Sequence, residues 1–293
     1  MNELLRIEGL SKSFGRKRVL KDLELTAEKG KVYGLLGRNG AGKTTLARIL
    51  MGIIPADGGT IHFGGRAIDF SETDYKKDIG YIPEDPFFYD SMTVGGLLEF
   101  NGRFYPRWKA DKALAWVKEF SLETGTRIRE MSRGMKLKLE LAVALAAEPE
   151  LLILDDPTSG LDVPTRRDFL REIIAELAAS GTTILFASHL VHELERVVER
   201  IGILHSGRLV LEEDFEAVKE RTKRVRLTFE EPLSGPLNLD GVLSERRNGR
   251  IVEAVVTKWD GAMDARIRSL GALAREVESL SLEDIFVGYV SGD

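Results

Sequence analysis

A glycine-rich segment carries residue types suited to binding the phosphates of a nucleotide. Residues 37–45 read GRNGAGKTT and fill the pattern G-x-x-x-x-G-K-[ST]. Glycines permit a tight turn whose N–H groups approach phosphate oxygens. Lys43 would bridge the outer phosphates as a point charge, and Thr44 would offer its hydroxyl to Mg²⁺. The predicted phosphate-binding residues are Gly37, Arg38, Asn39, Gly40, Ala41, Gly42, Lys43, Thr44 and Thr45.

The residues on either side of this segment argue against a chance glycine-rich turn. Residues 31–36 (KVYGLL) predict a short buried strand before it. Residues 44–51 (TTLARILM) predict a helix after it, whose N-terminus would face the phosphates. The sequence therefore predicts a nucleotide site between a strand and a helix.

Two adjacent acids follow a second apolar run. Residues 151–155 (LLILD) predict a buried strand that ends in Asp155, placed to hold Mg²⁺ beside the phosphate loop. Asp156 comes directly after it. On residue types alone, one metal ligand and one ordinary loop acid would explain the pair equally well. The sequence DDPTSGLD (155–162), which contains both acids, favours a joint role for them at the nucleotide site.

Further polar groups lie where predicted elements begin or end. Ser132 is placed to cap the helix predicted over 136–147 (KLKLELAVALAA). Alternatively, Ser132, Gly134 and the helix N-terminus would bind an anion. His189 comes two residues after the apolar run 182–187, at the end of the sequence FASH (186–189); a lone histidine there is more often structural.

The elements that must position these groups follow from hydrophobic periodicity. Strands are predicted over 4–10, 19–26, 60–63, 79–83, 151–155 and 182–187. Helical spacing over 94–104 and 109–120 predicts a helical insertion between about 84 and 130. A helix over 165–179 between two apolar strands makes a β–α–β unit, which implies a parallel sheet.

The character of the chain changes again near residue 222. Residues 219–224 (KERTKR) predict a helix end and linker. Beyond them, strands are predicted over 225–229 and 251–257, and helices over 263–270 and 281–289. This small α+β appendage carries no motif. Its roles as a structural addition, a stabiliser of a dimer or a ligand sensor remain open.

Composition excludes several classes of protein. The 293 residues are 43% hydrophobic and 30% charged, as in a soluble globular protein. The net charge of −5 argues against a general nucleic-acid binder. The chain has no cysteine, so disulfide frameworks and thiolate metal sites are excluded. The start MNELLRIEGL lacks a signal-peptide core, and no apolar run reaches ~18 residues. We expect a cytoplasmic protein whose membrane role, if any, comes through a partner.

Taken together, the motifs resemble those of the ATP-binding-cassette (ABC) ATPases over residues 3–220. The phosphate loop, a signature-like segment at 131–136, the acidic strand end, residues 159–162 (SGLD) and His189 occur in the family's order. The resemblance implies an α/β fold with a P-loop NTPase (RecA-like) core, an antiparallel β subdomain and an α-helical subdomain. The expected domains are 1–222, with helices about 84–135, and an α+β accessory domain over 223–293.

The resemblance also implies roles for single residues. ATP would lie between the phosphate loop of one subunit and the signature of another, formed by Ser132, Arg133, Gly134 and Met135. Asp156, His189 and Lys43 would be catalytic, and the Mg²⁺ ligands would be Thr44, Glu84 and Asp155. Phe14 matches the aromatic residue that stacks on adenine, although a turn-flanking core residue is the alternative. Asp162 matches the aspartate of the loop that crosses the dimer interface.

Three positions depart from the family pattern. The usual Leu-Ser-Gly-Gly-Gln signature reads MSRGM at 131–135. Glu84 stands where a glutamine normally senses Mg²⁺ and the membrane partner. Asp156 replaces the catalytic glutamate, which withdraws the carboxylate by ~1.5 Å. Because a general base needs about 2.6–3.2 Å to its water, we expect slower hydrolysis but not its loss.

The resulting prediction is the ATP-hydrolysing subunit of a membrane transporter, cytoplasmic and held on the inner face of the membrane by a polytopic permease. The segments at 81–84, 131–135 and 282–286 resemble the exporter branch with a separately encoded permease. The apolar cluster at 86–89 would meet that permease or would pack under the helical region. A homodimer and a heterodimer both remain open. The alternatives are a poorly hydrolysing regulatory subunit and a soluble ABC ATPase of DNA repair or translation.

Overall fold

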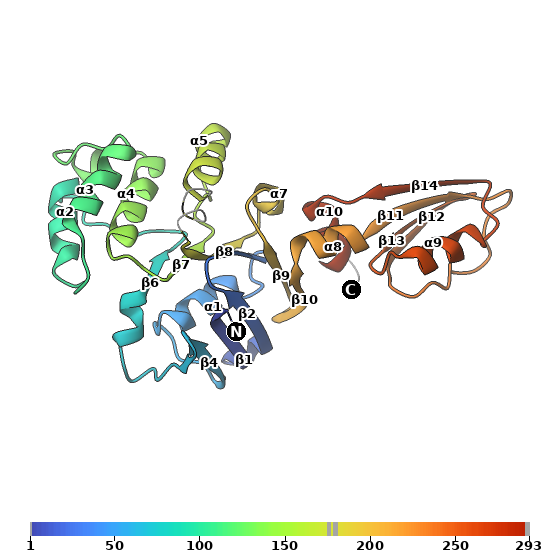
Figure 1. Ribbon diagram of the computed structural model, residues 1–293, viewed down its shortest axis with the longest axis horizontal. Coiled ribbons are helices and arrows are strands. Elements are labelled where there is room, and N and C mark those ends of the chain that lie inside the picture. The colour runs from blue at the N-terminus through green and yellow to red at the C-terminus, as the bar shows by residue number, and fades with distance from the viewer. Residues whose placement is uncertain (1, 175–176, 178–180, 291–293) are drawn as a thin grey trace.

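A six-stranded sheet forms the centre of the protein, whose computed structural model describes residues 2–174, 177 and 181–290 (Figure 1). The strand order is β10-β9-β3-β8-β7-β6. These strands are Val32–Leu36 (β3), Ile79–Ile82 (β6), Leu151–Asp155 (β7), Thr183–Ser188 (β8), Arg200–His205 (β9) and Arg208–Asp214 (β10). Neighbours from β9 to β6 run parallel, whereas β10 pairs antiparallel with β9. The predicted parallel sheet is therefore confirmed.

The central strands are apolar throughout because both faces of the sheet are covered. Every residue of β3, β7 and β8 is buried. Parallel strands place their carboxyl ends at one edge of the sheet. This edge therefore collects the phosphate loop after β3, Glu84 after β6, Asp155 and Asp156 at the end of β7, and His189 after β8.

A second, antiparallel sheet has the order β2-β1-β4-β5. Its strands are Glu3–Phe14 (β1), Lys17–Glu28 (β2), Gly58–Phe63 (β4) and Arg66–Ala67 (β5). The strands predicted over 4–10 and 19–26 extend further and meet in a hairpin with Phe14 at its tip. Helix α1 (Lys43–Leu50) contacts β2 on one side and β7 and β8 on the other, so it lies between the two sheets.

The predicted helical insertion contains helices Val94–Gly102 (α2) and Ala110–Glu119 (α3) and a short 3₁₀ turn, Ile128–Glu130 (η2); Arg133–Ala146 (α4) follows it, and another 3₁₀ turn, Asp74–Asp78 (η1), precedes it. The predicted start of the last helix at residue 136 is wrong. Ser132 accepts a hydrogen bond from the N–H of Met135 (3.2 Å), which caps α4 and starts it at Arg133. The signature segment therefore forms the first turn of a helix rather than a loop before it.

The helix predicted over 165–179 is also altered. Helix α5 (Val163–Asp168) passes into a π-helical segment, η3 (Phe169–Ile174). Most of the remainder of that prediction lies outside the described residues. A short helix, Val191–Leu194 (α7), follows His189 and leads to β9.

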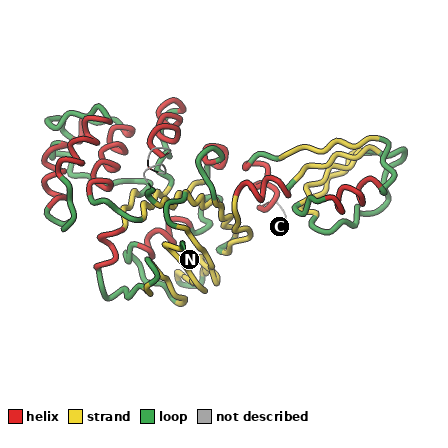
Figure 2. The backbone as a smooth tube through the Cα atoms, viewed as in Figure 1, coloured by secondary structure: helices red, strands yellow, loops and turns green. Residues whose placement is uncertain are grey.

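The C-terminal region contains a third sheet in the order β12-β13-β11-β14. Its strands are Lys223–Thr228 (β11), Val242–Asn248 (β12), Ile251–Val256 (β13) and Ala274–Ser279 (β14), with helices Phe215–Arg221 (α8), Gly261–Arg268 (α9) and Leu282–Val290 (α10). The helix end predicted over 219–224 is confirmed, because α8 ends at Arg221, but the predicted linker is wrong, because only the buried Thr222 separates α8 from β11. Figure 2 shows the helical region, the central strands and the C-terminal strands as three successive parts of the molecule.

Three hydrophobic clusters hold these parts together. One lies between the central sheet and the helical region, a second surrounds α1, and a third lies between α9 and the C-terminal sheet. Leu282, Ile285 and Phe286 of α10 belong to the first cluster, although they follow the C-terminal sheet in sequence. None of the helices in the described part of the chain is long and apolar enough to cross a membrane.

Candidate active site

The phosphate loop forms the turn between β3 and α1. Gly42 lies just before α1 with φ at 118°, a conformation that side chains rarely adopt. A Cβ there would also lie 2.7 Å from Leu20 Cδ2 and 3.3 Å from the Val19 carbonyl oxygen. Only glycine fits this position, and the free N–H groups of the first turn of α1 stay accessible to an anion.

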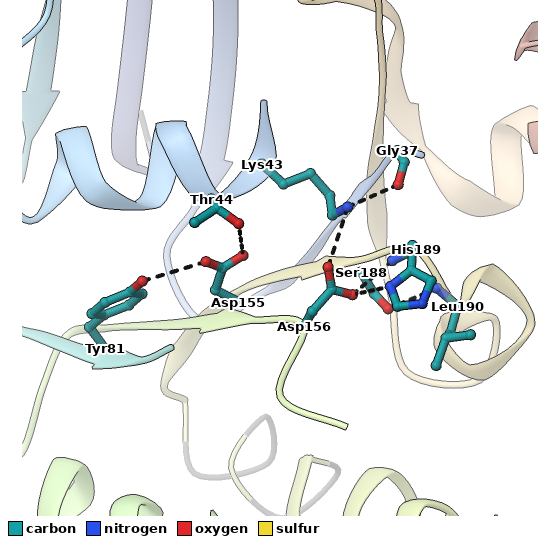
Figure 3. A network of polar contacts seen from close by, with 9 residues as sticks. All are labelled: Gly37, Lys43, Thr44, Tyr81, Asp155, Asp156, Ser188, His189 and Leu190. Carbon is teal, nitrogen blue, oxygen red and sulfur yellow. Dashed lines mark hydrogen bonds and ion pairs between the residues drawn. The ribbon is translucent and has the colours of Figure 1, made fainter. Parts of the chain in front are cut away.

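Lys43 lies in the middle of the site, with only 5% of its surface exposed. Its Nζ donates to the carbonyl oxygen of Gly37 (3.0 Å) and forms an ion pair with Asp156 Oδ2 (3.3 Å). Figure 3 shows Lys43 between these two acceptors. The ammonium group is therefore held where a phosphate could compete with the carboxylate for it.

Asp155 is held by two hydroxyl groups. Thr44 Oγ1 donates to its Oδ1 (3.1 Å), and the Tyr81 hydroxyl donates to its Oδ2 (3.5 Å) (Figure 3). Burial raises the pKa of Asp155, and the charge of Asp156 adds to the rise, whereas Thr44 and Lys43 oppose it. Burial also raises the pKa of Tyr81 to about 12, so its hydroxyl stays neutral.

These oxygens fit the ligand preference of Mg²⁺, a hard cation. Thr44 and Asp155 are in direct contact, Glu84 lines the same cavity as Thr44, and the charge of Glu84 adds to the rise in the pKa of Asp155. A divalent cation would offset that rise by favouring the ionised carboxylate. The predicted metal ligands therefore lie together. Tyr81 was not assigned a role from sequence, because its contact with Asp155 depends on β6 and β7 being neighbours.

Asp156 links the phosphate loop to His189. Its Oδ1 accepts a hydrogen bond from the His189 N–H (2.9 Å) and lies 2.7 Å from His189 Nδ1. Its φ of 46° turns the chain sharply after β7. One carboxylate thus contacts both Lys43 and His189, a contact that the separation of these residues along the chain does not reveal.

A cavity of about 410 Å³ opens in front of these groups. It is lined by Phe14, Lys17, Val19, Asn39, Gly40, Gly42, Lys43, Thr44, Thr45, Glu84 and Asp156. The ring of Phe14 is half exposed, which disfavours its alternative role as a core residue. Lys17 and Val19 are not among the site residues predicted from the sequence, although their position beside Phe14 in the hairpin would indicate that they line the nucleotide site.

The signature residues line a different hollow, of about 270 Å³. Ser132, Arg133, Gly134, Met135 and Asp162 contribute to it. Within the described part of the chain, the two hollows have no lining residue in common. One chain therefore does not bring its own signature to its own phosphate loop.

Arg133 connects this second hollow to the loop after β6. Its guanidinium donates to the carbonyl oxygen of Glu84 (3.1 Å) and lies 3.5 Å from Asp85 Oδ1. Gly160 lies against the guanidinium group, and its φ of 73° is a conformation that favours glycine at that position. Asp162 caps α5 by accepting from the N–H of Thr165 (2.9 Å).

Comparisons with known proteins agree with this geometry. The ABC transporter family matches residues 20–159. The ABC transporter ATP-binding protein YtrB of Bacillus subtilis is 33% identical over 289 residues, covering 99% of each chain. The bacitracin transport ATP-binding protein BcrA of Bacillus licheniformis is 36% identical over 228 residues, covering 76% of this chain and 74% of that protein.

A solved structure of the ATP-binding subunit of an ABC transporter superposes with a TM-score of 0.66 at 28% identity, covering 74% of this chain and 92% of that one. The match to YtrB spans nearly the whole chain and so extends through the C-terminal sheet and α10. The fold and the family predicted from the sequence are both confirmed. This chain belongs to the ABC transporter family and is one of its ATP-binding, ATP-hydrolysing subunits.

Proposed function

We propose that this chain hydrolyses Mg²⁺-bound ATP to drive a separate permease that exports its cargo across the cell membrane. The observation that carries the proposal is the contact of Asp156 with both Lys43 and His189 at the carboxyl edge of the parallel sheet. The bacitracin relative is named for transport, which favours transport of a cargo by this chain as well, and export is the direction that the resemblance to the exporter branch implies. The permease would select the cargo and hold this chain at the inner face of the membrane.

The contacts of the site suggest how its residues act. Lys43 would exchange Asp156 for the outer phosphates of ATP, which frees the carboxylate to accept a proton from the attacking water. Water oxygen would bond to the γ-phosphorus as the bond to the β–γ bridging oxygen breaks, which releases ADP and phosphate. His189 would contact the γ-phosphate and orient the water. Mg²⁺, held by Thr44, Asp155 and Glu84, would neutralise charge on the β- and γ-phosphates.

The separate signature hollow favours a site shared between two chains. Ser132 and Gly134 of a second subunit would close over the γ-phosphate, with the N–H groups of its α4 facing the anion. Asp162 would lie at the same interface. Closure on ATP and reopening after hydrolysis would then move the permease. The second subunit is either a copy of this chain or a related one.

Phe14 is expected to stack on adenine, so Phe14→Ala should raise the Kd for ATP about 5–30-fold, since stacking contributes about 1–2 kcal/mol. Phe14→Trp should keep the affinity because it keeps the stacking surface. Binding of inorganic triphosphate should not change in either variant, because it has no base. Equal Kd values for ATP in wild type and Phe14→Ala, measured by calorimetry, would assign Phe14 to packing instead.

An exposed aromatic patch marks the expected contact with the permease. Phe87, Tyr89, Phe100 and Phe104 are 86%, 53%, 37% and 66% exposed. Successive ring centroids lie 5.8, 6.2 and 5.1 Å apart, so the rings form one continuous surface. The patch begins three residues after Glu84, the residue aligned with the family's permease-sensing glutamine. The exposure of Phe87 and Tyr89 favours the permease contact, whereas Phe88 packs against the hydrophobic cluster of the helical region, as the alternative predicts.

The patch supplies the test of the proposed function. The wild-type chain should retain one polytopic protein from membrane extracts. The double variant Phe87→Ala/Phe104→Ala should retain at least ~10-fold less of that protein, because buried aromatic anchors dominate interface energies. The Kd of the purified double variant for ATP should stay within twofold. Leu114→Ala, which removes an exposed apolar side chain elsewhere in the helical region, is the matched control. Failure to recover any polytopic protein with wild type would favour a soluble ABC ATPase.

A further inference from the structure

The C-terminal helix reaches the element that follows the catalytic histidine. Helix α7 begins two residues after His189 and contacts α10. Val191 and Leu194 of α7 are buried in the same hydrophobic cluster as Leu282 and Ile285 of α10. A helix of four residues has little stability of its own, so its orientation depends on the surfaces that pack against it. Figure 1 shows α7 and α10 between the central sheet and the C-terminal strands.

Glu195, the residue directly after α7, joins three elements. Its Oε2 accepts a hydrogen bond from the N–H of Leu282 (3.2 Å), the first residue of α10. Its Oε1 accepts from Lys219 Nζ of α8 (3.1 Å). A carboxylate at a helix N-terminus is favoured by the unpaired N–H groups and by the helix dipole. Glu195 therefore fixes the start of α10 to the end of α7.

Helix α10 is in turn tied to the C-terminal sheet. Arg224 of β11 donates to Asp284 Oδ1 of α10 (2.7 Å). Arg221 at the end of α8 donates to the carbonyl oxygen of Thr257 (2.6 Å). Only the buried Thr222 separates α8 from β11. Because Arg224 of β11 holds Asp284, a displacement of the C-terminal sheet would carry α10 with it.

His189 is held from the other side by Asp156, through its backbone N–H and its ring. His189 therefore lies between two anchors, the Asp156 carboxylate in the ATP site and the contact between α7 and α10. We propose that Glu195 is a positioning residue for hydrolysis, because it clamps α10 onto α7 and so fixes the position of His189. Through this clamp, the C-terminal segment 223–290 controls turnover. This inference rests on the role of His189 in the proposed function.

The test compares steady-state ATP hydrolysis of the full chain with nucleotide affinity. Glu195→Ala should lower kcat about 3–10-fold while the Kd values for ATP and ADP stay within twofold. Glu195→Gln should recover at least half of the lost rate, because the amide oxygen still accepts from the Leu282 N–H. Glu283→Ala, which removes an exposed carboxylate from the same turn of α10, is the matched control and should leave kcat within 1.5-fold.

A double-mutant cycle separates positioning from a loss of fold. In a His189→Ala background, Glu195→Ala should cause no further fall in kcat, because the group it positions is gone. A full 3–10-fold fall in that background, or a wild-type kcat for Glu195→Ala alone, would overturn the inference. If His189→Ala itself turned over like wild type, the role of His189 in the proposed function would fail first. Should Glu195→Ala not fold, Glu195→Asp, which withdraws the carboxylate by ~1.5 Å, should show a smaller loss with the same dependence on His189.

Discussion

Lys43→Ala should weaken ATP binding about 100-fold and reduce hydrolysis by a further factor of about 10²–10³. The ammonium group is buried beside the Gly37 carbonyl and Asp156, so it would contact the outer phosphates by exchanging the Asp156 carboxylate for them. Charge-assisted hydrogen bonds contribute about 1.5–3 kcal/mol each, and the variant loses those to the phosphates. Isothermal calorimetry and a phosphate-release assay measure the two effects.

Lys17→Ala is the matched control for this prediction. Lys17 lines the same cavity but is exposed, so solvent screens its charge and we expect at most a threefold change in Kd. Thermal unfolding of Lys43→Ala should also be recorded, because the variant removes one partner of the buried Asp156. Normal binding and hydrolysis by a folded Lys43→Ala protein would refute the assignment of the nucleotide site.

Asp156→Asn should lower kcat by about 10²–10⁴ while ATP binding is retained. The amide oxygen can still accept the His189 N–H, so the turn after β7 should persist. The amide accepts no proton from water, and it places no negative charge near the γ-phosphate. We therefore expect an ATP-bound dimer that persists in size-exclusion chromatography with MgATP, whereas the wild-type dimer dissociates after hydrolysis.

Two further substitutions sharpen the interpretation of Asp156. Asp156→Glu advances the carboxylate by ~1.5 Å and should raise kcat several-fold, because it restores the length of the family's usual residue. Asp85→Asn removes an exposed carboxylate outside the cavity lining and should leave kcat within twofold. Unchanged turnover in Asp156→Asn would show that Asp156 is not the base. That result would favour the alternative of a poorly hydrolysing regulatory subunit.

The fold prediction was most accurate for the strongly apolar strands. The strand ending at Asp155 and the one preceding the phosphate loop are buried on both faces, so their composition alone identifies them. Strand β14 (AREVES) was not predicted, because an exposed edge strand has no apolar period and is held by its ladder to β11. The start of α4 lies three residues earlier than the apolar period predicts, because Arg133, Gly134 and Met135 carry no such period and are placed in the helix by the Ser132 cap.

The sequence by itself determined the phosphate loop, the acidic strand end and the ABC family, because these depend on residue type at short, local spacing and on the order of motifs. The separation of the signature hollow from the phosphate loop agrees with the shared site that the family resemblance implied. Only the tertiary structure decided that one carboxylate, Asp156, contacts both Lys43 and His189. It also decided that Glu195 clamps α10 onto α7. These contacts join segments far apart along the chain, and strand order and packing, which no local pattern encodes, bring them within hydrogen-bond distance.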